Sequence, residues 1–264
     1  AALFGLRQLN SNQKGLQTAS ERLSSGKRIN RASDDAAGLA IAARLATQLL
    51  GSQTAYRNAN DGISLVQTAE GALSEVSEIT QRIRELAIQS SIGTLNDTDR
   101  ANIQLEVDQL QDQAAQIFSS TEFNGKAILG ENSTLTLQVG DEAGDQIAIS
   151  TTDLNAEFTA NGFFSADVST ANSAQTALSA LDASLDTLNR SRADFGAISN
   201  RLESVGRNLE NEAENIAASK SRIVDADYAA EIASRTSSLI LQNAGLATLS
   251  QANVSNGLVS QLLK

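Results

Sequence analysis

The side chains in this sequence with the most obvious capacity for chemistry are two close pairs of carboxylates. Asp34 and Asp35 are adjacent, and Asp225 and Asp227 are separated by one alanine. A convergent carboxylate pair can act as general acid and base or bind a divalent cation. Neighbouring residues of a helix point to different faces, so Asp34 and Asp35 do not converge on one atom. Both pairs precede expected helices, and we therefore predict that they are helix caps that favour the positive end of the helix dipole.

Two loops with the residue types of cation sites lack the spacing that such sites require. Asp225-Ala226-Asp227 matches the opening of a calcium loop, but Ala230 occupies the sixth position, where glycine is needed, and no closing glutamate follows in register. The segment 140–145 is more typical of a solvated turn between strands. The sequence also lacks a phosphate-binding glycine loop, a serine paired with a base and a basic-aromatic patch. We predict no catalytic residue, cofactor or metal ion.

The composition disfavours several functional classes. The 264 residues include no histidine and no cysteine, which removes the commonest general base, the thiolate nucleophile and the two commonest zinc ligands. The net charge of −11 argues against nucleic acid and anionic membranes as partners, and no apolar run approaches the roughly 18 residues of a membrane span. An enzyme that uses carboxylates alone, such as a hydrolase, is the least favoured interpretation. The absence of proline and the 3% aromatic content favour long helices packed through aliphatic side chains.

The strongest pattern is an unbroken heptad in the second half of the chain. Apolar residues recur every seven positions over 181–223, along a helix on the order of 60 Å long. An isolated helix cannot bury such a seam, so its partners lie within the chain or in other copies. A last helix carries a similar stripe that runs on to Leu258 and Leu262. The predicted self-assembly seam comprises Leu181, Leu188, Phe195, Leu202, Leu209, Ile216, Ile223, Leu239 and Leu246.

The first half contains shorter helical patterns. Leucines at heptad-compatible spacing over 6–23 predict an amphipathic helix that stops at Gly26. An alanine-rich helix is expected after Asp35, and a separate long helix over 63–92. Apolar steps of four and three over 103–117 predict a coiled-coil helix that begins near Asn96, Asp97 and Asp99.

The period changes to two in the middle of the chain. Alternation over 135–149 predicts a β-hairpin whose turn is 140–145, preceded by a turn at Phe123-Asn124-Gly125. The segment 151–176, rich in Ser, Thr, Ala and Asn, is predicted to be the least structured part and the place where the chain divides. We predict a mainly α fold, a long antiparallel coiled-coil-like bundle with a small β-hairpin, in which the N- and C-terminal segments pair. The expected regions are 1–32, 33–122, 123–176, 177–224 and 225–264.

Several motifs, in this order along the chain, closely resemble those of bacterial flagellins. LSSGKRINRASDDAAGLAIAAR over 23–44 is similar to the N-terminal signature of that family, and SRIVDADYAAE over 221–231 to a C-terminal one. QRIRELAIQ, the turn at 123–125 and ILQNAGLATLSQAN resemble further landmarks. The sequence departs from the family pattern in two places. A short segment replaces the variable outer domain, and the end lacks a proline that is common there.

The resemblance implies a structural subunit that self-assembles into the extracellular flagellar filament for motility. The chain ends would pair as a coiled coil along the central channel, while the longer helices and the hairpin would form the surrounding inner tube. It further implies export as an unfolded chain through the type III apparatus, and the first ten residues lack the plan of a cleavable secretory signal. The implied partners are other copies, filament cap and hook-junction proteins, and an export chaperone. The short middle segment implies little outer decoration.

The resemblance also implies that one charged helix face contacts an immune receptor. Many flagellins are recognised by Toll-like receptor 5, and Arg82, Leu86, Gln89 and Glu106 match the corresponding motif positions. Leu110 stands where strongly stimulating relatives have arginine, which weakens the expected contact. By pattern alone, the same segment is a helix with one apolar stripe and a solvated charged face.

Two alternatives stay open at this point, one from the same superfamily and one from another class. A hook–filament junction protein of the same superfamily would share the helical termini. A cell-surface binding protein or adhesin, for example for a polysaccharide, would need aromatic platforms, and the chain has only two Tyr and seven Phe. The complete motif set and the compact middle favour the filament subunit.

Overall fold

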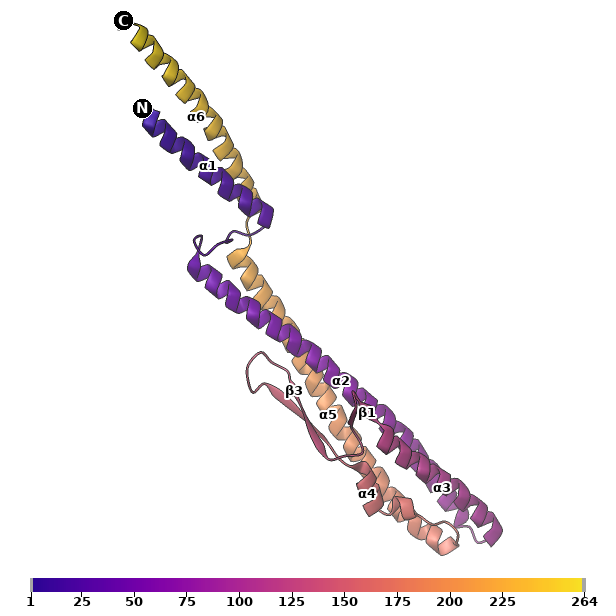
Figure 1. Ribbon diagram of the computed structural model, residues 1–264. Coiled ribbons are helices and arrows are strands. Elements are labelled where there is room, and N and C mark those ends of the chain that lie inside the picture. Colours follow the sequence, from indigo (N-terminus) through magenta and orange to yellow (C-terminus); the bar gives the residue numbers. More distant parts are fainter. Residues whose placement is uncertain (1, 263–264) are drawn as a thin grey trace. The chain divides into compact units, whose positions relative to one another are not determined.

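The computed structural model describes residues 2–262, and the side chains of residues 3–251 and 254. Two compact units are present: unit 1 comprises Ala1–Leu50 and Ala213–Lys264, and unit 2 comprises Gly51–Glu212. Two long helices, α2 (Ala36–Ser90) and α5 (Ala171–Val224), contribute to both units (Figure 1). The predicted mainly α fold with a small hairpin is confirmed. The side chains of Leu258 and Leu262, which were expected to extend the last apolar stripe, lie outside the described residues.

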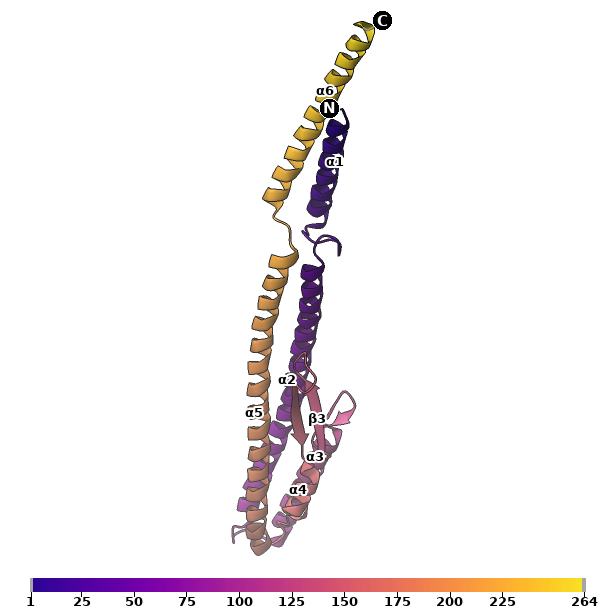
Figure 2. The same ribbon diagram turned by 90° about the vertical axis from the view of Figure 1, so that its left-hand side faces the viewer.

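Unit 1 contains the two terminal helices, α1 (Ala2–Ser25) and α6 (Tyr228–Leu262), which lie side by side (Figures 1 and 2). The predicted pairing of the chain ends is therefore confirmed. Helix α1 stops at Gly26 as expected, because φ at this glycine is 70° and its N–H closes the last turn onto the Arg22 carbonyl at 2.8 Å. A β-bridge between Lys27 and Asp225 joins the two connectors that follow α1 and precede α6.

Three of the four carboxylates in the two pairs of unit 1 bind backbone N–H groups. Asp225 does not, because its Oδ2 accepts from Ser221 Oγ at 2.6 Å, so the helix cap predicted at Asp225 was wrong. Asp35 Oδ1 accepts a hydrogen bond from the N–H three residues later at 2.8 Å, and Asp227 Oδ1 from the N–H two residues later at 2.9 Å. These two predicted helix caps are confirmed. Asp34 acts differently, because its Oδ2 accepts from the N–H groups of Arg31 and Asn30 at 3.0 and 3.1 Å. These two bonds lower the pKa of Asp34 below its ordinary value of 3.8.

The core of unit 2 lies among α2, α3 (Asp97–Ser120) and α5. Helix α3 begins at Asn96, whose side chain accepts from the Asp99 N–H at 2.8 Å, as predicted. Helix α2 runs through 55 residues without a break, whereas the sequence patterns indicated two separate helices. Gly51 and Gly62 lie inside this helix without breaking it. A glycine within a helix costs only about 1 kcal/mol relative to alanine, which the packing of a long helix can offset.

The predicted β-hairpin is confirmed by β3 (Ser133–Gln138) and β4 (Gln146–Thr151), which are antiparallel. Leu135 lies opposite Ile149 and Leu137 opposite Ile147, so one face of the hairpin is apolar. A smaller ladder of β1 (Glu122–Phe123) and β2 (Lys126–Ala127) encloses the predicted Asn-Gly turn.

The prediction for the segment 151–176 was wrong, because this segment is folded. It forms α4 (Leu154–Ala160) and a 3₁₀ turn, η1 (Phe163–Ser165). The ring of Phe158 lies 4.9 Å from that of Phe118 and 4.8 Å from that of Phe163, both edge to face. These elements are too short to show a period, so pattern reasoning could not detect them. The division between the units also lies elsewhere, within α2 and α5.

Candidate self-assembly surface

The terminal helices α1 and α6 meet where glycines and other small residues of one helix face side chains of the other. A methyl group added at Gly15 would lie 3.3 Å from Ser238 Oγ, and one added at Gly5 would lie 2.9 Å from Leu249 Cδ2. Ala19 is also buried, with 2% of its surface exposed. Small residues allow two helix backbones to approach closely and leave room for half-buried leucines such as Leu9 and Leu249, while other large apolar side chains lie on the outer faces of both helices.

Those large side chains are exposed to solvent. Phe4 of α1 is 69% exposed, and Ile240 of α6 is 61% exposed. Consecutive exposed residues at 239, 240 and 241 point to different faces of α6, because a helix turns by about 100° per residue. A helix that is apolar on several faces requires partners on several sides. We call the following set the terminal apolar surface: Leu3, Phe4, Leu6, Ile232, Leu239, Ile240, Leu241, Leu246 and Val254.

The structure divides the predicted self-assembly seam into three groups. Leu239 and Leu246 are 47% and 51% exposed and belong to the terminal apolar surface. Ile216 and Ile223 are half-buried in unit 1. The assignment is corrected for the first part of the heptad, because this part of α5 is already covered by α2 and other elements of the same chain. The side chains buried in the core of unit 2 are Leu181, Leu188, Phe195, Leu202 and Leu209.

The charged face predicted to contact a receptor lies on α2 and α3. Arg82 Nη2 and Nε donate to Glu106 Oε1 at 2.8 and 3.0 Å, and the hydrogen bond and charge of Glu106 raise the pKa of Arg82. Gln89 is exposed beside them on α2. Leu86 is different, since only 2% of its surface is exposed and it packs in the core. Among these residues, Arg82, Gln89 and Glu106 expose their side chains, and Leu110 is half-buried.

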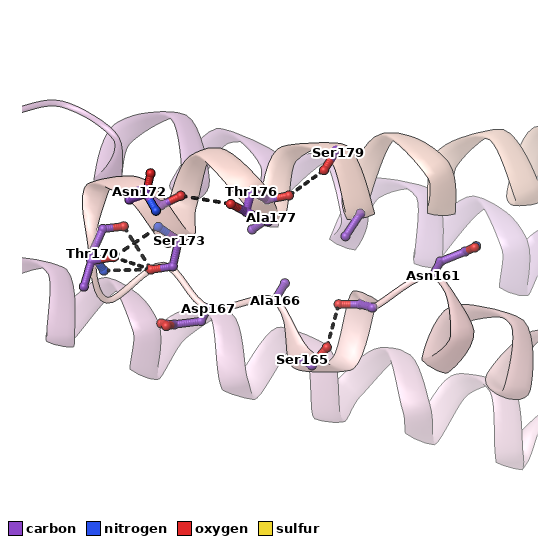
Figure 3. A pocket seen from close by; sticks show the side chains of 12 residues that line it. Asn161, Ser165, Ala166, Asp167, Thr170, Asn172, Ser173, Thr176, Ala177 and Ser179 are labelled. Atoms are coloured by element: carbon purple, nitrogen blue, oxygen red, sulfur yellow. Dashed lines mark hydrogen bonds between the residues drawn. The ribbon is translucent and has the colours of Figure 1, made fainter.

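The Ser/Thr-rich segment borders a shallow hollow of about 670 Å³ beside η1 and the start of α5 (Figure 3). Its lining consists of hydroxyl, amide and small side chains with Asp167, and it includes no aromatic ring. The hydroxyls are bound to their own helix: Thr176 Oγ1 donates to the Asn172 carbonyl at 3.1 Å, and Ser179 Oγ to the Thr176 carbonyl at 2.7 Å. A hollow without an aromatic stacking platform does not favour a polysaccharide-binding role.

Metal sites and membrane-spanning helices are both absent from the part of the chain that the structure describes. No group of three or more Asp, Glu, His or Cys side chains is arranged to hold a metal ion there. Within the same residues, every helix is too short or too polar to cross a bilayer.

Comparison with known proteins places these features in a family. The model of the bacterial flagellin N-terminal helical region matches residues 1–134, and that of the C-terminal helical region matches residues 178–263. The flagellin of Halalkalibacterium halodurans is 42% identical over all of this chain and 97% of its own length. The flagellin of Bacillus subtilis is 40% identical over all of this chain and 98% of its own length.

Solved structures show the same fold. The crystal structure of Bacillus cereus flagellin is 31% identical, with a TM-score of 0.54, and the match covers 62% of this chain and 94% of that chain. A structure from Vibrio parahaemolyticus, described as a flagellar hook-associated protein, has a TM-score of 0.62 at 14% identity and covers 73% of this chain and 100% of that chain. At that identity the second likeness shows a shared fold alone.

Proposed function

Because this chain belongs to the bacterial flagellin family, we propose that its terminal apolar surface is where neighbouring copies pack against it. The chain is a structural subunit of the extracellular flagellar filament. The observation that supports the proposal is the exposure of nine large apolar side chains on α1 and α6. Burying each such side chain gains roughly 1.5–3 kcal/mol, so association of several copies is strongly favoured.

A paired substitution tests this surface. The double variant Leu239→Ser/Leu246→Ser removes two exposed leucines from α6, and the matched control Leu105→Ser removes a leucine of α3 that is 65% exposed. Filaments grown from short seeds are counted by negative-stain electron microscopy, and helicity is followed by circular dichroism. We expect the double variant to stay helical and lose elongation, while the control elongates. Normal elongation of the double variant would contradict the proposal.

The regions expected from the sequence are also part of the proposal. We propose that 1–32 and 225–264 form the inner layer of the filament, and that 33–122 and 177–224 form the surrounding tube. Pairing of α1 with α6 supports the first assignment. The region 123–176, which contains the hairpin and α4, packs on the core of unit 2 and would add little outer decoration.

The narrower partners also belong to the proposal. Family membership supports export as an unfolded chain through the flagellar type III apparatus, with a chaperone, and contacts with cap and hook-junction proteins. Flagellin is a structural family, and the lack of any catalytic activity in this chain stays a prediction. Identity of about 40% to flagellins over the whole chain supports a filament subunit over a junction protein.

Recognition by Toll-like receptor 5 is a second proposed function, supported by the exposed side chains of Arg82, Gln89 and Glu106. The test is receptor signalling by Arg82→Ala, with Arg84→Ala as the control. Arg84 is similarly exposed and similarly paired, but its Nε donates to Asp182 Oδ1 of α5 at 2.8 Å. We expect Arg82→Ala to reduce signalling and Arg84→Ala to retain it. Unchanged signalling by Arg82→Ala would remove this proposal and leave the filament role untouched.

A further inference from the structure

A hollow of about 410 Å³ lies in unit 2, between the turn of the β-hairpin and the C-terminal half of α5. The remaining lining residues, besides four aliphatic ones, are glycines and polar or charged residues of the turn, of β4 and of α5. Lysine and arginine side chains combine an aliphatic stem with a charged head, so a hollow of this kind suits either of them. The four aliphatic lining residues are Val139, Ile147, Val205 and Leu209.

The ionised side chains at this hollow are mainly carboxylates. Asp141 and Asp145 belong to the turn, and Glu212 belongs to α5. Arg201 is the one cation among the lining residues. Asp145 Oδ2 accepts a hydrogen bond from the Glu142 N–H at 3.4 Å, but none of the three carboxylates forms an ion pair among the described residues. We call the hollow with these three carboxylates the acidic hollow.

A group of cations lies in unit 1, at the connectors that follow α1 and precede α6. Backbone pairing holds these connectors together, with the Arg28 N–H donating to the Val224 carbonyl at 2.6 Å. The guanidinium of Arg28 also donates, from Nη2 to the Ile223 carbonyl at 2.7 Å. The end of α5 adds two further cations at this place. We call the following set the basic collar: Lys27, Arg28, Lys220 and Arg222.

The basic collar lacks acidic partners within the described part of the chain, where none of its four side chains forms an ion pair. The carboxylates of the connector before α6 are bound elsewhere. Asp225 accepts from Ser221 Oγ at 2.6 Å, and Asp227 accepts from the N–H two residues later. Lysine and arginine side chains of the collar are exposed at positions 27, 28 and 222. The collar therefore presents positive charge to other molecules.

We propose that the basic collar of one copy docks at the acidic hollow of a neighbouring copy. A collar side chain places its stem on the aliphatic lining and its charged head beside the carboxylates. The two surfaces differ, so the contact is heterologous, and repetition of a heterologous contact builds an open helical assembly. This inference rests on the proposed function, because it adds a second contact between copies to that of the terminal apolar surface.

The proposed attraction acts at one place, whereas repulsion between copies is summed over the whole acidic surface of unit 2. Elongation of the unmodified chain is therefore still expected to accelerate as salt screens that repulsion. Exposed complementary charges act mainly on specificity and on the rate of association. The rate of elongation at low salt is accordingly the most sensitive measure of the contact.

Two charge-reversed variants test it: the collar variant Lys27→Glu/Arg222→Glu and the hollow variant Asp141→Lys/Glu212→Lys. Elongation from short seeds of the unmodified chain is followed by light scattering at about 10 mM NaCl, and helicity by circular dichroism. Alone, each variant has like charge on both surfaces, so elongation is expected to slow on the order of tenfold. In an equimolar mixture each surface meets an opposite one on the other variant, so elongation should recover.

Overall charge does not account for these expectations. Four units of charge change the net charge from −11 to −15 in the collar variant and to −7 in the hollow variant. The hollow variant is less acidic, so general repulsion alone would speed its elongation, and a slower rate isolates the local contact. Both variants stay acidic, so no general attraction draws them together. Neither alters Arg28 or Asp145, whose side chains bond to the backbone.

Two matched controls make the same charge changes at other exposed side chains. Lys14→Glu/Arg44→Glu changes unit 1, and Glu75→Lys/Glu78→Lys changes unit 2. Both controls should stay helical. Their effects on elongation should be much smaller than those of the collar and hollow variants, because only the overall charge is altered.

Three results would overturn the inference. Normal elongation of either variant alone would show that the contact is absent. Slow elongation of the mixture, with recovery only in a chain that carries all four reversals, would place the contact within one chain. Equal slowing by the controls would assign the effect to overall charge. Failure of the assembly proposal is distinguishable, since it would appear as normal elongation of Leu239→Ser/Leu246→Ser whatever the charge variants do.

Discussion

Unit 2 and the terminal helices of unit 1 use apolar residues in opposite ways. In unit 2 the large side chains of α2, α3 and α5 are inside, and Leu73, Phe118 and Leu188 have no exposed surface. In the pair of α1 and α6, glycines and half-buried leucines make the contact, and side chains such as Phe4 and Ile240 are outside. Unit 2 therefore buries its large apolar side chains by itself, whereas the terminal pair needs other molecules to cover its exposed ones.

The two units also differ in net charge. Unit 1 contains eleven basic and seven acidic residues, a net charge of +4, whereas unit 2 contains nine basic and 24 acidic residues, a net charge of −15. An acidic surface keeps a subunit soluble but opposes close approach of several copies. If the terminal apolar surface drives assembly as proposed, the attraction lies in the terminal helices and the repulsion in unit 2.

The largest expected effect comes from removing the ring at the centre of the aromatic cluster. Phe158→Ala deletes a fully buried side chain in contact with two other rings, so the free energy of unfolding should fall by about 3–5 kcal/mol. Urea denaturation followed by circular dichroism measures it. The counterpart Leu239→Ala removes an exposed side chain and should change that free energy by less than about 0.5 kcal/mol. Equal losses from the two variants would mean that the contrast between the units is wrong.

A smaller effect is expected where the hairpin meets the helices of unit 2. A methyl group at Gly62 would overlap Leu137 Cδ1 and lie 3.0 Å from Leu202 Cδ1, whereas one at Gly71 would meet nothing within 4 Å. Gly62→Ala should therefore destabilise unit 2 by about 1–3 kcal/mol. Gly71→Ala, in the same helix, should stabilise it by about 0.5–1 kcal/mol, because alanine favours the helix. Thermal unfolding of both variants gives the sign, and two changes of the same sign would contradict the packing described.

The sequence predicts local features of this chain better than contacts between distant segments. Helices with a sustained period, the β-hairpin and the caps at Asn96 and Asp35 could be predicted, because each depends on residues close together in the sequence. Burial of the seam by the chain itself could not, since a heptad shows that a partner exists without identifying it. The same limit explains Leu86, whose motif position suggested a receptor contact and whose side chain lies in the core.

Long-range polar contacts were missed altogether. The guanidinium of Arg100 is buried against the end of α2 and donates to the carbonyls of Ser90, Leu95 and Ile92 at 2.8–3.0 Å. Gln111 Nε2 likewise donates to the Phe163 carbonyl at 2.8 Å and holds the segment after α4. Neither residue stands out in the sequence, because charged and amide side chains on a helix are ordinarily solvated. Only the arrangement of the helices makes these groups structural.

The charge contrast predicts how assembly responds to salt. Raising NaCl from about 10 mM to about 150 mM shortens the Debye length from roughly 30 Å to roughly 8 Å and screens the repulsion between acidic units. Elongation from seeds should therefore accelerate severalfold, as measured by light scattering. The apolar attraction between terminal helices is weakly affected over this range. A rate that falls with salt would indicate that attraction between opposite charges dominates the contacts between copies.

The smallest effect concerns Asp167, at the loop before α5. Its Oδ1 accepts from the Ser169 N–H at 2.8 Å, and this bond is the first cause of a pKa below the ordinary value of 3.8. A lowered pKa in the folded chain gives stability that is present above the ordinary value and is lost as the pH falls through the lowered one. Asp167→Asn should therefore be slightly less stable than the unmodified chain at about pH 7, and the difference should vanish near pH 2.

Asp34 provides the comparison in unit 1, because backbone N–H groups lower its pKa as well. Urea unfolding of both asparagine variants at the two pH values distinguishes the units. The core that dominates cooperative unfolding contains the neighbours of Asp167 and lies in unit 2, so only Asp167→Asn should shift the midpoint near pH 7. A shift of similar size in Asp34→Asn would show that the connector of unit 1 unfolds together with that core, and that the two units share one cooperative transition despite their opposite packing.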